Sequence, residues 1–286
     1  MLTVSARAKI NWSLKVKRKR YDGYHEIESL MQCITLSDTL TFELPDKAAD
    51  TITLESDTDI PRDVNLVYKA AVLLQKETGT NKGALIRLAK KIPVEAGLGG
   101  GSSDAAAALK GLAELWGVDV SDERLLALGA ELGSDVPFFL ICGAAVVTGR
   151  GECVRAVNVD KEYHLVLVKP AFGVSASWAY GNLGSFNKED SGTDALIKAL
   201  NAGDQNEISR HMTNDLEAPV FQAHPIIGDI KNALMDSGAF VSLMSGSGTT
   251  VFGVFKDSES SEKAALGLRG KYGTDYLVAK AETIHS

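Results

Sequence analysis

The chain has 286 residues, of which 45% are hydrophobic and 23% charged, and its formal net charge at pH 7 is −7. A chain of this length can bury a sizeable core and suggests about two domains, while the acidic balance argues against a nucleic-acid-binding protein, which normally has a basic surface. No stretch approaches the roughly 20 apolar residues of a membrane span, and the N-terminus lacks the pattern of a signal peptide, so we expect a cytoplasmic protein.

The cysteines and histidines form no recognisable disulfide or metal pattern. Cys33, Cys142 and Cys153 are odd in number and far apart in the sequence, so we expect reduced thiols. The histidines lack the His-x-x-x-His spacing, which disfavours a structural zinc site.

Residues 2–16 alternate between apolar and polar side chains almost without exception. This period of two predicts a long, half-buried strand. Lys9 and Asn11 fall on its polar face, two residues apart, so their side chains point the same way. That face is either solvated or part of a polar site, and the alternation does not decide between them.

A short turn follows a run of basic residues. Asp22 and Gly23 signal the turn, and Tyr21, Tyr24 and His25 crowd onto it. Aromatic rings and an imidazole in this position can form a stacking and hydrogen-bonding surface for a planar ligand. The alternative is a tyrosine packed beneath a hairpin.

The next elements alternate between strands and helices. The sequence predicts strands over residues 27–36, 39–44, 51–55 and 84–89, and helices over residues 65–75 and 122–132. The apolar residues of the first helix recur at helical spacing.

The stretch over residues 93–108 is the most distinctive of the chain. Four of the five residues over 97–101 are glycine, and serines, an aspartate and a run of alanines follow. Glycines permit positive φ and close approach, and Ser102, Ser103 or Asp104 can cap the helix that begins here. Unpaired amides and the helix dipole then favour an anion. The stretch predicts a polyphosphate cradle, with a flexible loop without ligand as the alternative.

A second helix start follows at Asp135. Pro137, two residues later, suits the first turn of a helix. Asp135 is therefore either an N-cap or a carboxylate held at a helix start beside an active site.

The second half of the chain is mainly helical and begins after a buried strand. The strands predicted over residues 143–147 and 152–157 close the first half, and the strands of the second half cover residues 163–169, 240–244, 250–255 and 275–281. The predicted helices cover residues 175–182, 194–201, 204–211, 214–222, 226–237 and 258–270, with a polar linker over 187–192 and a small-residue turn over 245–248.

Three separated segments share the order and spacing of a known motif set. They are Ala8–Leu14, Pro93–Ala107 and Leu243–Phe252. Together they resemble the three motifs of the GHMP kinase superfamily (galactokinase, homoserine kinase, mevalonate kinase and phosphomevalonate kinase). The resemblance spans the whole chain. Trp12 stands where a leucine is more usual, and we expect it to alter packing and not chemistry.

One branch of this superfamily matches further segments. Asp22–Glu26, Asn65–Ala70 and Gly133–Phe139 resemble the branch whose substrate is a cytidine-diphospho sugar alcohol. The resemblance implies an α+β, two-domain GHMP kinase fold. Its ATP-binding domain, over residues 1–157, has a ribosomal-protein-S5-like βαβ core. Its C-terminal domain, over residues 158–286, is α+β and ferredoxin-like, and the active site is expected in the cleft between the two domains.

The resemblance also implies an activity and its residues. We expect transfer of the γ-phosphoryl group of ATP to a hydroxyl of the sugar alcohol, with Mg²⁺, and with Asp135 as the base and Lys9 beside it. Ser103 is a possible Mg²⁺ contact. The residues expected to bind substrate are Asn11, Tyr24, His25, Tyr180, Ser245 and Gly246. The residues expected to bind ATP are Asn65, Pro93, Val94, Glu95, Ala96, Gly97, Leu98, Gly99, Gly100, Gly101, Ser102 and Ser103.

Two other functions remain open at this point. The chain could be another GHMP kinase, acting on mevalonate, homoserine or a sugar, or a non-catalytic ATP-binding sensor of the same fold. The sensor is disfavoured because both Lys9 and Asp135 are present. We expect ATP and the small-molecule substrate as the ligands, no nucleic acid or membrane, and a monomer or homodimer.

Overall fold

The computed structural model of the chain describes all residues except 46–49, 185, 187–191 and 285–286. The chain forms two compact units. The first unit comprises residues 1–8, 37–93 and 99–142, and the second comprises residues 9–36, 94–98 and 143–286. Both units are discontinuous in sequence because two long strands, β1 (Leu2–Lys19) and β2 (His25–Glu43), contribute to each. The predicted boundary between residues 157 and 158 stays a prediction.

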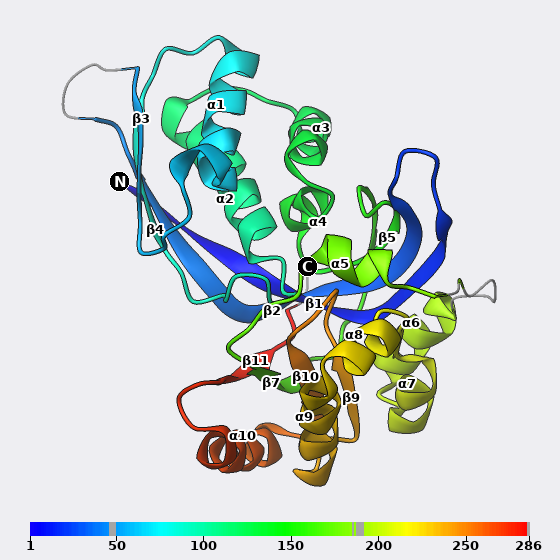
Figure 1. Cartoon of the computed structure of the whole chain (residues 1–286). Helices are drawn as coiled ribbons and strands as arrows, with labels where there is room; N and C mark the ends of the chain where they lie inside the picture. The colour runs from blue at the N-terminus through cyan, green and yellow to red at the C-terminus, as the bar shows by residue number, and fades with distance from the viewer. Residues whose placement is uncertain (46–49, 185, 187–191, 285–286) are drawn as a thin grey trace. The chain divides into compact units, whose positions relative to one another are not determined.

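The first unit packs helices beside a short stack of strands (Figure 1). The C-terminal part of β2 pairs antiparallel with β4, and β4 pairs parallel with β3. The elements of this unit, besides its parts of β1 and β2, are β3 (Ile52–Ser56), a 3₁₀ turn (Arg62–Val64), α1 (Leu66–Thr78), β4 (Ala84–Ala89), α2 (Gly100–Trp116), α3 (Asp122–Leu132) and α4 (Val136–Ile141).

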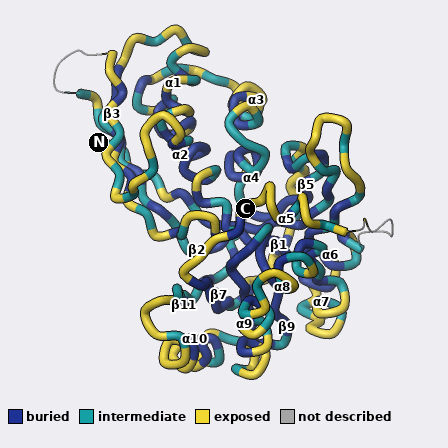
Figure 2. Tube along the Cα trace, in the orientation of Figure 1, coloured by how far each residue is buried: buried dark blue, intermediate teal, exposed yellow. Residues whose placement is uncertain are grey.

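Helix α2 is the most buried helix of this unit, and Figure 2 shows it largely in dark blue. Its alanines, residues 105–108, are all buried. Gly111 lies against β2, where an added Cβ would come within 2.5 Å of the Phe42 ring. The small residues therefore allow α2 to approach the strand closely, which gives the dense packing that is usual in protein interiors.

The second unit contains the N-terminal part of β2, which pairs antiparallel with β5 and so leads to β6. A parallel bridge joins β1 to β8 at Ser13 and Leu14. The elements beyond β1 and β2 are β5 (Ala144–Gly149), β6 (Cys153–Val157), β7 (His164–Lys169), α5 (Ala176–Gly181), α6 (Thr193–Ala202), α7 (Gln205–His211), β8 (Thr213–Asn214), α8 (Glu217–Ala223), α9 (Pro225–Asp236), β9 (Val241–Met244), β10 (Val251–Phe255), α10 (Ser258–Tyr272) and β11 (Leu277–Glu282).

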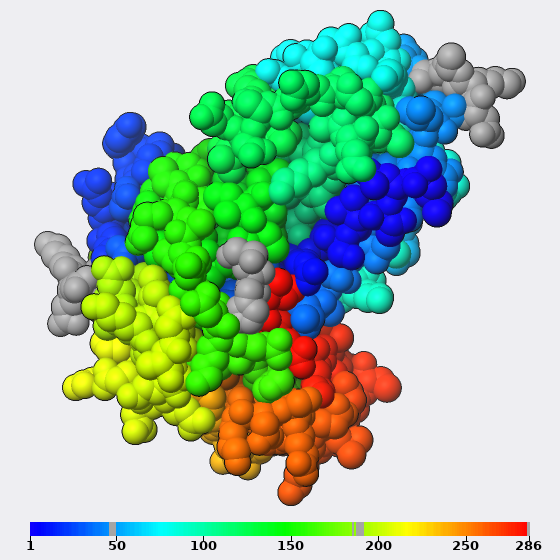
Figure 3. Space-filling model, turned by 180° about the vertical axis from the view of Figure 1, so that it is seen from behind, coloured from blue at the N-terminus to red at the C-terminus, as the bar shows by residue number. Residues whose placement is uncertain are grey.

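A separate antiparallel sheet with the strand order β11-β7-β10-β9 closes this unit. Strand β10 is buried along its whole length, and α9 and α10 pack against the sheet. In Figure 3 the orange surface of α10 borders the red surface of the C-terminal part of the chain. The predicted α+β architecture is confirmed.

Most predicted elements are present, with three corrections. Strand β1 is buried on both faces from Ala8 to Leu14, so it is half-buried only near its ends. Strand β2 is one continuous strand and not two. The helix predicted over 214–222 begins later, at Glu217, because Thr213 and Asn214 pair with β1.

Other expectations can be compared with the structure directly. None of the three cysteines, all of which are described, forms a disulfide bond. None of the described helices is long and apolar enough to cross a membrane. The linker predicted over 187–192 lies, apart from Gly192, outside the described residues.

Candidate active site

Lys9 and Asn11 lie side by side in the buried middle of β1. The Lys9 Nζ donates to Asn11 Oδ1 at 2.6 Å, and Asn11 Nδ2 donates to Ser29 Oγ at 2.7 Å. Lys9 is 3% exposed and Asn11 is 0% exposed. A solvated polar face is therefore the wrong interpretation. A lysine this deeply buried requires polar partners, and this residue pair forms a polar site within the second unit.

The first half of the glycine loop packs on the small-residue turn after β9. The Ser245 hydroxyl donates to the Gly97 carbonyl at 2.9 Å. Gly97 has φ +73°, and an added Cβ would lie 2.0 Å from the Ser245 carbonyl oxygen. At Gly246 an added Cβ would lie 3.1 Å from Lys9 Nζ. Close approach therefore requires glycine at Gly97, and at Gly246 the positive φ of +55° and the tight contact favour it. The second unit brings together the predicted residues Lys9, Gly97, Ser245 and Gly246.

Backbone hydrogen bonds hold the same part of the loop. The Lys9 amide donates to the Leu98 carbonyl at 3.0 Å, and the Thr250 amide donates to the Ala96 carbonyl at 3.2 Å. Residues 94–98 are thus tied to β1 on one side and to the start of β10 on the other.

The second half of the glycine loop starts α2 in the first unit. The helix begins at Gly100, and its N-cap is Gly99, with φ +70° and no side-chain cap. The prediction that Ser102, Ser103 or Asp104 caps the helix is wrong, because the helix starts before them. A glycine cap offers no side-chain acceptor to the first-turn amides, which suits a site where an anion takes that place.

Three charged side chains lie buried behind this turn. The Lys90 Nζ lies 2.5 Å from Asp38 Oδ2 and 2.7 Å from Asp104 Oδ2. Burial raises the pKa of Asp104 to about 7, and Asp38 adds to this rise while Lys90 opposes it. For Lys90 burial acts to lower the pKa, but the two carboxylates outweigh it and the net pKa is raised. The lysine is therefore charged, and we name Asp38, Lys90 and Asp104 the buried triad.

Asp135 occupies the N-cap position of α4, but its side chain makes no capping hydrogen bond. Pro137 lies in the first turn, as predicted, and α4 packs against α2. The structure therefore confirms that Asp135 stands at the N-cap position, but its side chain does not cap the helix. Asp135 belongs to the first unit and Lys9 to the second, so their predicted proximity stays a prediction.

Asn65 begins α1 as predicted. Its side chain accepts a hydrogen bond from the Val67 amide at 2.9 Å and is buried. This N-cap bond accounts for an asparagine at position 65 without any ligand. Its predicted contact with ATP stays a prediction.

His25 and Tyr180 come together in the second unit although they are far apart in sequence. Their rings stack with centroids 5.2 Å apart and planes 20° apart, and Phe186 lies 5.8 Å from His25. Burial, followed by the charge of Lys19, lowers the pKa of His25 below its ordinary value, so the ring is neutral at pH 7. We name His25, Tyr180 and Phe186 the aromatic cluster.

The other predicted aromatic residue does not join this cluster. Tyr24 is 50% exposed, and the Arg150 guanidinium lies 5.0 Å above its ring. Conversely, Phe186 was not predicted from sequence. It stands in a polar segment with no helical or strand periodicity, so only the folded chain identifies it.

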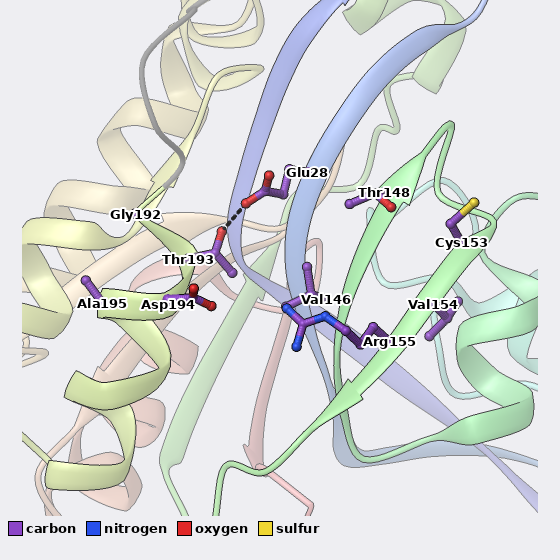
Figure 4. Close-up of a pocket in the computed structure, with 10 residues that line it drawn as sticks. All are labelled: Glu28, Val146, Thr148, Cys153, Val154, Arg155, Gly192, Thr193, Asp194 and Ala195. Atoms are coloured by element: carbon purple, nitrogen blue, oxygen red, sulfur yellow. Dashed lines mark hydrogen bonds between the residues drawn. The ribbon is translucent and has the colours of Figure 1, made fainter.

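Two cavities of the second unit have lining residues that are close in sequence to Tyr180 or His25. One, of about 920 Å³, is lined by Phe186, Phe221 and Asn214. The other, of about 660 Å³, lies between β2, β5, β6 and the start of α6, and the Thr193 hydroxyl donates to Glu28 Oε1 at 2.7 Å across it (Figure 4). None of the predicted site residues lines the second cavity. Its lining comes from distant segments, so no local motif could have indicated it.

Among the described residues, the acidic and histidine side chains grouped closely enough to hold a metal ion do not belong to the glycine loop. Within the described ranges, the group that could hold an ion is Glu162, His164 and Glu282, in the second unit. The loop itself offers the serine hydroxyls of α2. Mg²⁺ commonly keeps several waters and binds through few protein ligands together with substrate phosphates, so a Mg²⁺ that enters with a nucleotide needs few side chains of the protein.

Comparison with known proteins identifies the family. The family description "GHMP kinases N terminal domain" matches residues 65–143, and "GHMP kinases C terminal" matches residues 196–274. A protein of Thermodesulfovibrio yellowstonii named 4-diphosphocytidyl-2-C-methyl-D-erythritol kinase is 45% identical over 277 residues, covering 94% of this chain and 95% of its own. A protein of the same name from Pelotomaculum thermopropionicum is 44% identical over 270 residues, covering 94% of each chain.

Solved structures agree with these relatives. A crystal structure of 4-(cytidine 5'-diphospho)-2C-methyl-D-erythritol kinase superposes with a TM-score of 0.84 at 33% identity and covers 98% of this chain and 99% of its own. A homoserine kinase from Cytophaga hutchinsonii, with a TM-score of 0.78 at 21% identity over 99% of this chain and 94% of its own, shares the fold. The chain therefore belongs to the GHMP kinases and, within them, to the 4-diphosphocytidyl-2-C-methyl-D-erythritol kinase family.

Proposed function

We propose that the chain transfers the γ-phosphoryl group of ATP to the 2-hydroxyl of 4-diphosphocytidyl-2-C-methyl-D-erythritol. The products are the 2-phosphate and ADP, and the reaction belongs to the non-mevalonate route to isoprenoid precursors, in the cytoplasm. Family membership supports the reaction. The observation on this chain that carries the substrate assignment is the aromatic cluster, which shares the second unit with the buried pair of Lys9 and Asn11.

Phosphoryl transfer needs an in-line hydroxyl, neutralised phosphate charge and precise positioning, and little covalent chemistry from the protein. We assign Asp135 to orient the substrate hydroxyl and to receive its proton late, as the new O–P bond forms. Its place at the N-cap of α4 supports this role, because the helix start fixes the backbone that carries the carboxylate.

Lys9 is the cation for this step. Its burial and its bond to Asn11 support a fixed ammonium group that stabilises charge on the substrate hydroxyl or on the transferring group. Asn11 holds Lys9 in place and offers its amide to the substrate.

The glycine loop binds the triphosphate in this proposal. Gly97 and Gly99 have positive φ, and the uncapped first turn of α2 presents backbone amides to an anion. Mg²⁺ would enter with ATP and neutralise phosphate charge, with Ser102 or Ser103 as its candidate protein ligands.

The aromatic cluster accounts for the cytidine end. A neutral imidazole can hydrogen-bond a cytosine edge, and an aromatic ring can cover the base, which is worth about 1–3 kcal/mol per base. A pyrimidine-binding surface of this kind would separate the enzyme from kinases that act on mevalonate, homoserine or a sugar.

A substrate panel tests the proposal. ADP release is measured with ATP, Mg²⁺ and, in turn, 4-diphosphocytidyl-2-C-methyl-D-erythritol, mevalonate, phosphomevalonate, homoserine and galactose. We expect turnover with the cytidine substrate alone, and ³¹P NMR should place the new phosphate on its 2-hydroxyl. Turnover with another acceptor would assign the chain to that reaction, and ATP binding without ADP release would indicate a sensor.

A further inference from the structure

The buried triad joins the segments that precede and follow the glycine loop in the chain. Lys90 comes directly after β4 and before the loop, while Asp104 lies in α2 after it. Asp38, in β2, completes the group. All three groups are in the first unit, and the two aspartates are 0% and 3% exposed.

The triad also holds backbone. Asp38 Oδ1 accepts hydrogen bonds from the Lys91 amide at 2.5 Å and the Ile92 amide at 2.7 Å. Ile92 in turn lies against Gly100, where an added Cβ would come within 2.9 Å of its side chain. The chain entering the loop is thereby fixed against the first residue of α2.

Stability alone does not account for this arrangement. Two carboxylates share one ammonium group, and Asp104 Oδ1 is buried without a hydrogen-bond partner among the described residues. A buried, unsatisfied oxygen is destabilising, and apolar residues of similar volume often stabilise a fold at least as well as buried ion pairs. The buried triad therefore fixes the position of the surrounding backbone, although it does not maximise the free energy of unfolding.

We propose that Asp38, Lys90 and Asp104 are positioning residues that hold the entry to the glycine loop and the first turn of α2 in the shape that binds the triphosphate of ATP. The inference rests on the proposed role of the loop. The triad acts through the backbone of Lys91, Ile92 and Gly100, and it leaves binding of the cytidine substrate unaffected.

Asp104→Ala tests the proposal with little risk to folding. The variant leaves Lys90 and Asp38 as a neutral pair and adds one alanine to the run over residues 105–108. Displacement of catalytic groups by small distances can be costly, so we expect the Kd of a non-hydrolysable ATP analogue and the KM for ATP each to rise about tenfold or more. The KM for the cytidine substrate should stay within about twofold.

Two further variants separate positioning from simple destabilisation. Asp104→Asn keeps an oxygen that can accept from Lys90 Nζ, so it should recover most of the lost ATP affinity. Lys82→Met is the matched control, because Lys82 Nζ donates to the Trp116 carbonyl at the opposite end of α2. It should lower the melting temperature without changing the KM for ATP.

Unchanged ATP affinity in a folded Asp104→Ala protein would overturn the proposal, and so would an equal loss for both substrates. If that variant does not fold, Lys90→Gln gives the same comparison, and wild-type ATP affinity there would again overturn it. The wild-type enzyme could fail to phosphorylate the cytidine substrate while Asp104→Ala still binds the ATP analogue weakly. That result would support the positioning role of the buried triad and would show that the proposed substrate is wrong.

Discussion

The glycine loop and the aromatic cluster differ in the kind of residue that forms them. The loop is backbone and small residues, held so closely that a Cβ at Gly97 would overlap the Ser245 carbonyl, and buried charges support it. The aromatic cluster consists of large side chains, His25, Tyr180 and Phe186, that stand partly exposed on separate segments. A phosphate is recognised by amides at fixed positions, whereas a base is recognised by a flat surface.

This difference predicts different responses to mutation. A backbone site is damaged by any added atom, and the damage spreads to its neighbours because packed interiors do not yield locally. A stacking surface loses only the contact that is removed. Mutations of the reacting groups, the loop and the cluster should therefore fall in a definite order of severity.

Asp135→Ala should have the largest effect. Removal of a positioned acid–base group typically costs about 10²–10⁴-fold in rate, so kcat should fall by that factor while the KM for both substrates changes little. Steady-state ADP release measures this. Asp122→Ala, at the first residue of α3, is the matched control and should keep normal kcat. Near-normal turnover by a folded Asp135→Ala protein would remove Asp135 as the base.

Gly97→Ala should come next. The new Cβ would meet the Ser245 carbonyl oxygen at 2.0 Å in a backbone with φ +73°, so the turn after β9 must shift. Overpacking of this kind costs about 1–3 kcal/mol or more, and ATP binding should weaken with it. Denaturant unfolding and the KM for ATP report the two effects.

Gly79→Ala controls for conformational strain alone. Gly79 has φ +65° but nothing within 4 Å of an added Cβ, so the cost should be about 1–2 kcal/mol with a normal KM for ATP. Equal behaviour of the two variants would show that the contact between the loop and the Ser245 turn is unimportant.

His25→Ala should affect one substrate only. His25 is the proposed hydrogen-bonding partner of the cytosine edge, and its loss leaves a polar group of the base unpaired at a cost of about 1–3 kcal/mol. This corresponds to a rise of roughly 5- to 150-fold in the KM for the cytidine substrate. The KM for ATP should not change. Tyr21→Ala is the control, since Tyr21 lies on the same turn but is fully exposed. An unchanged KM for the cytidine substrate would contradict the cytosine assignment.

The smallest effect concerns pH. Burial and Lys19 lower the folded-state pKa of His25, so the unfolded chain takes up the proton first as the pH falls. Stability from this site is therefore lost as the pH falls from about 6.5 through the lowered folded-state pKa. The melting temperature of the wild type should fall relative to His25→Gln between about pH 7 and pH 5. A constant difference would mean that the ring is not desolvated.

The glycine loop was predictable because its chemistry is local. The glycines over residues 97–101, the helix start and the alanines after it are neighbours in sequence, and the structure places them as one loop and helix. Lys9 and Asn11 were predictable as a pair from the alternation of β1. Their burial was not, because it comes from segments more than 80 residues away, such as the Leu98 carbonyl and the Ser245 turn.

The site residues that could not be predicted from sequence patterns depend on contacts between segments far apart in the chain. Phe186 has no sequence signal that separates it from other loop residues, and Tyr180 was identified by resemblance alone. Asp104 was predicted as a possible helix cap because a polar residue after glycines favours that role. Its true partner, Lys90, becomes evident only when β4 and α2 are packed together.

Trp12 shows how the chain depends on its whole length. Its indole is fully buried, donates to Gln32 at 2.7 Å, and meets Tyr163 and Phe252 edge to face. A fragment that ends near residue 157 would keep the tryptophan and lose both of these rings. Such a fragment would expose an apolar patch fitted to the missing piece, so the two halves of a split gene should yield chains that aggregate when made separately and reassociate when made in the same cell.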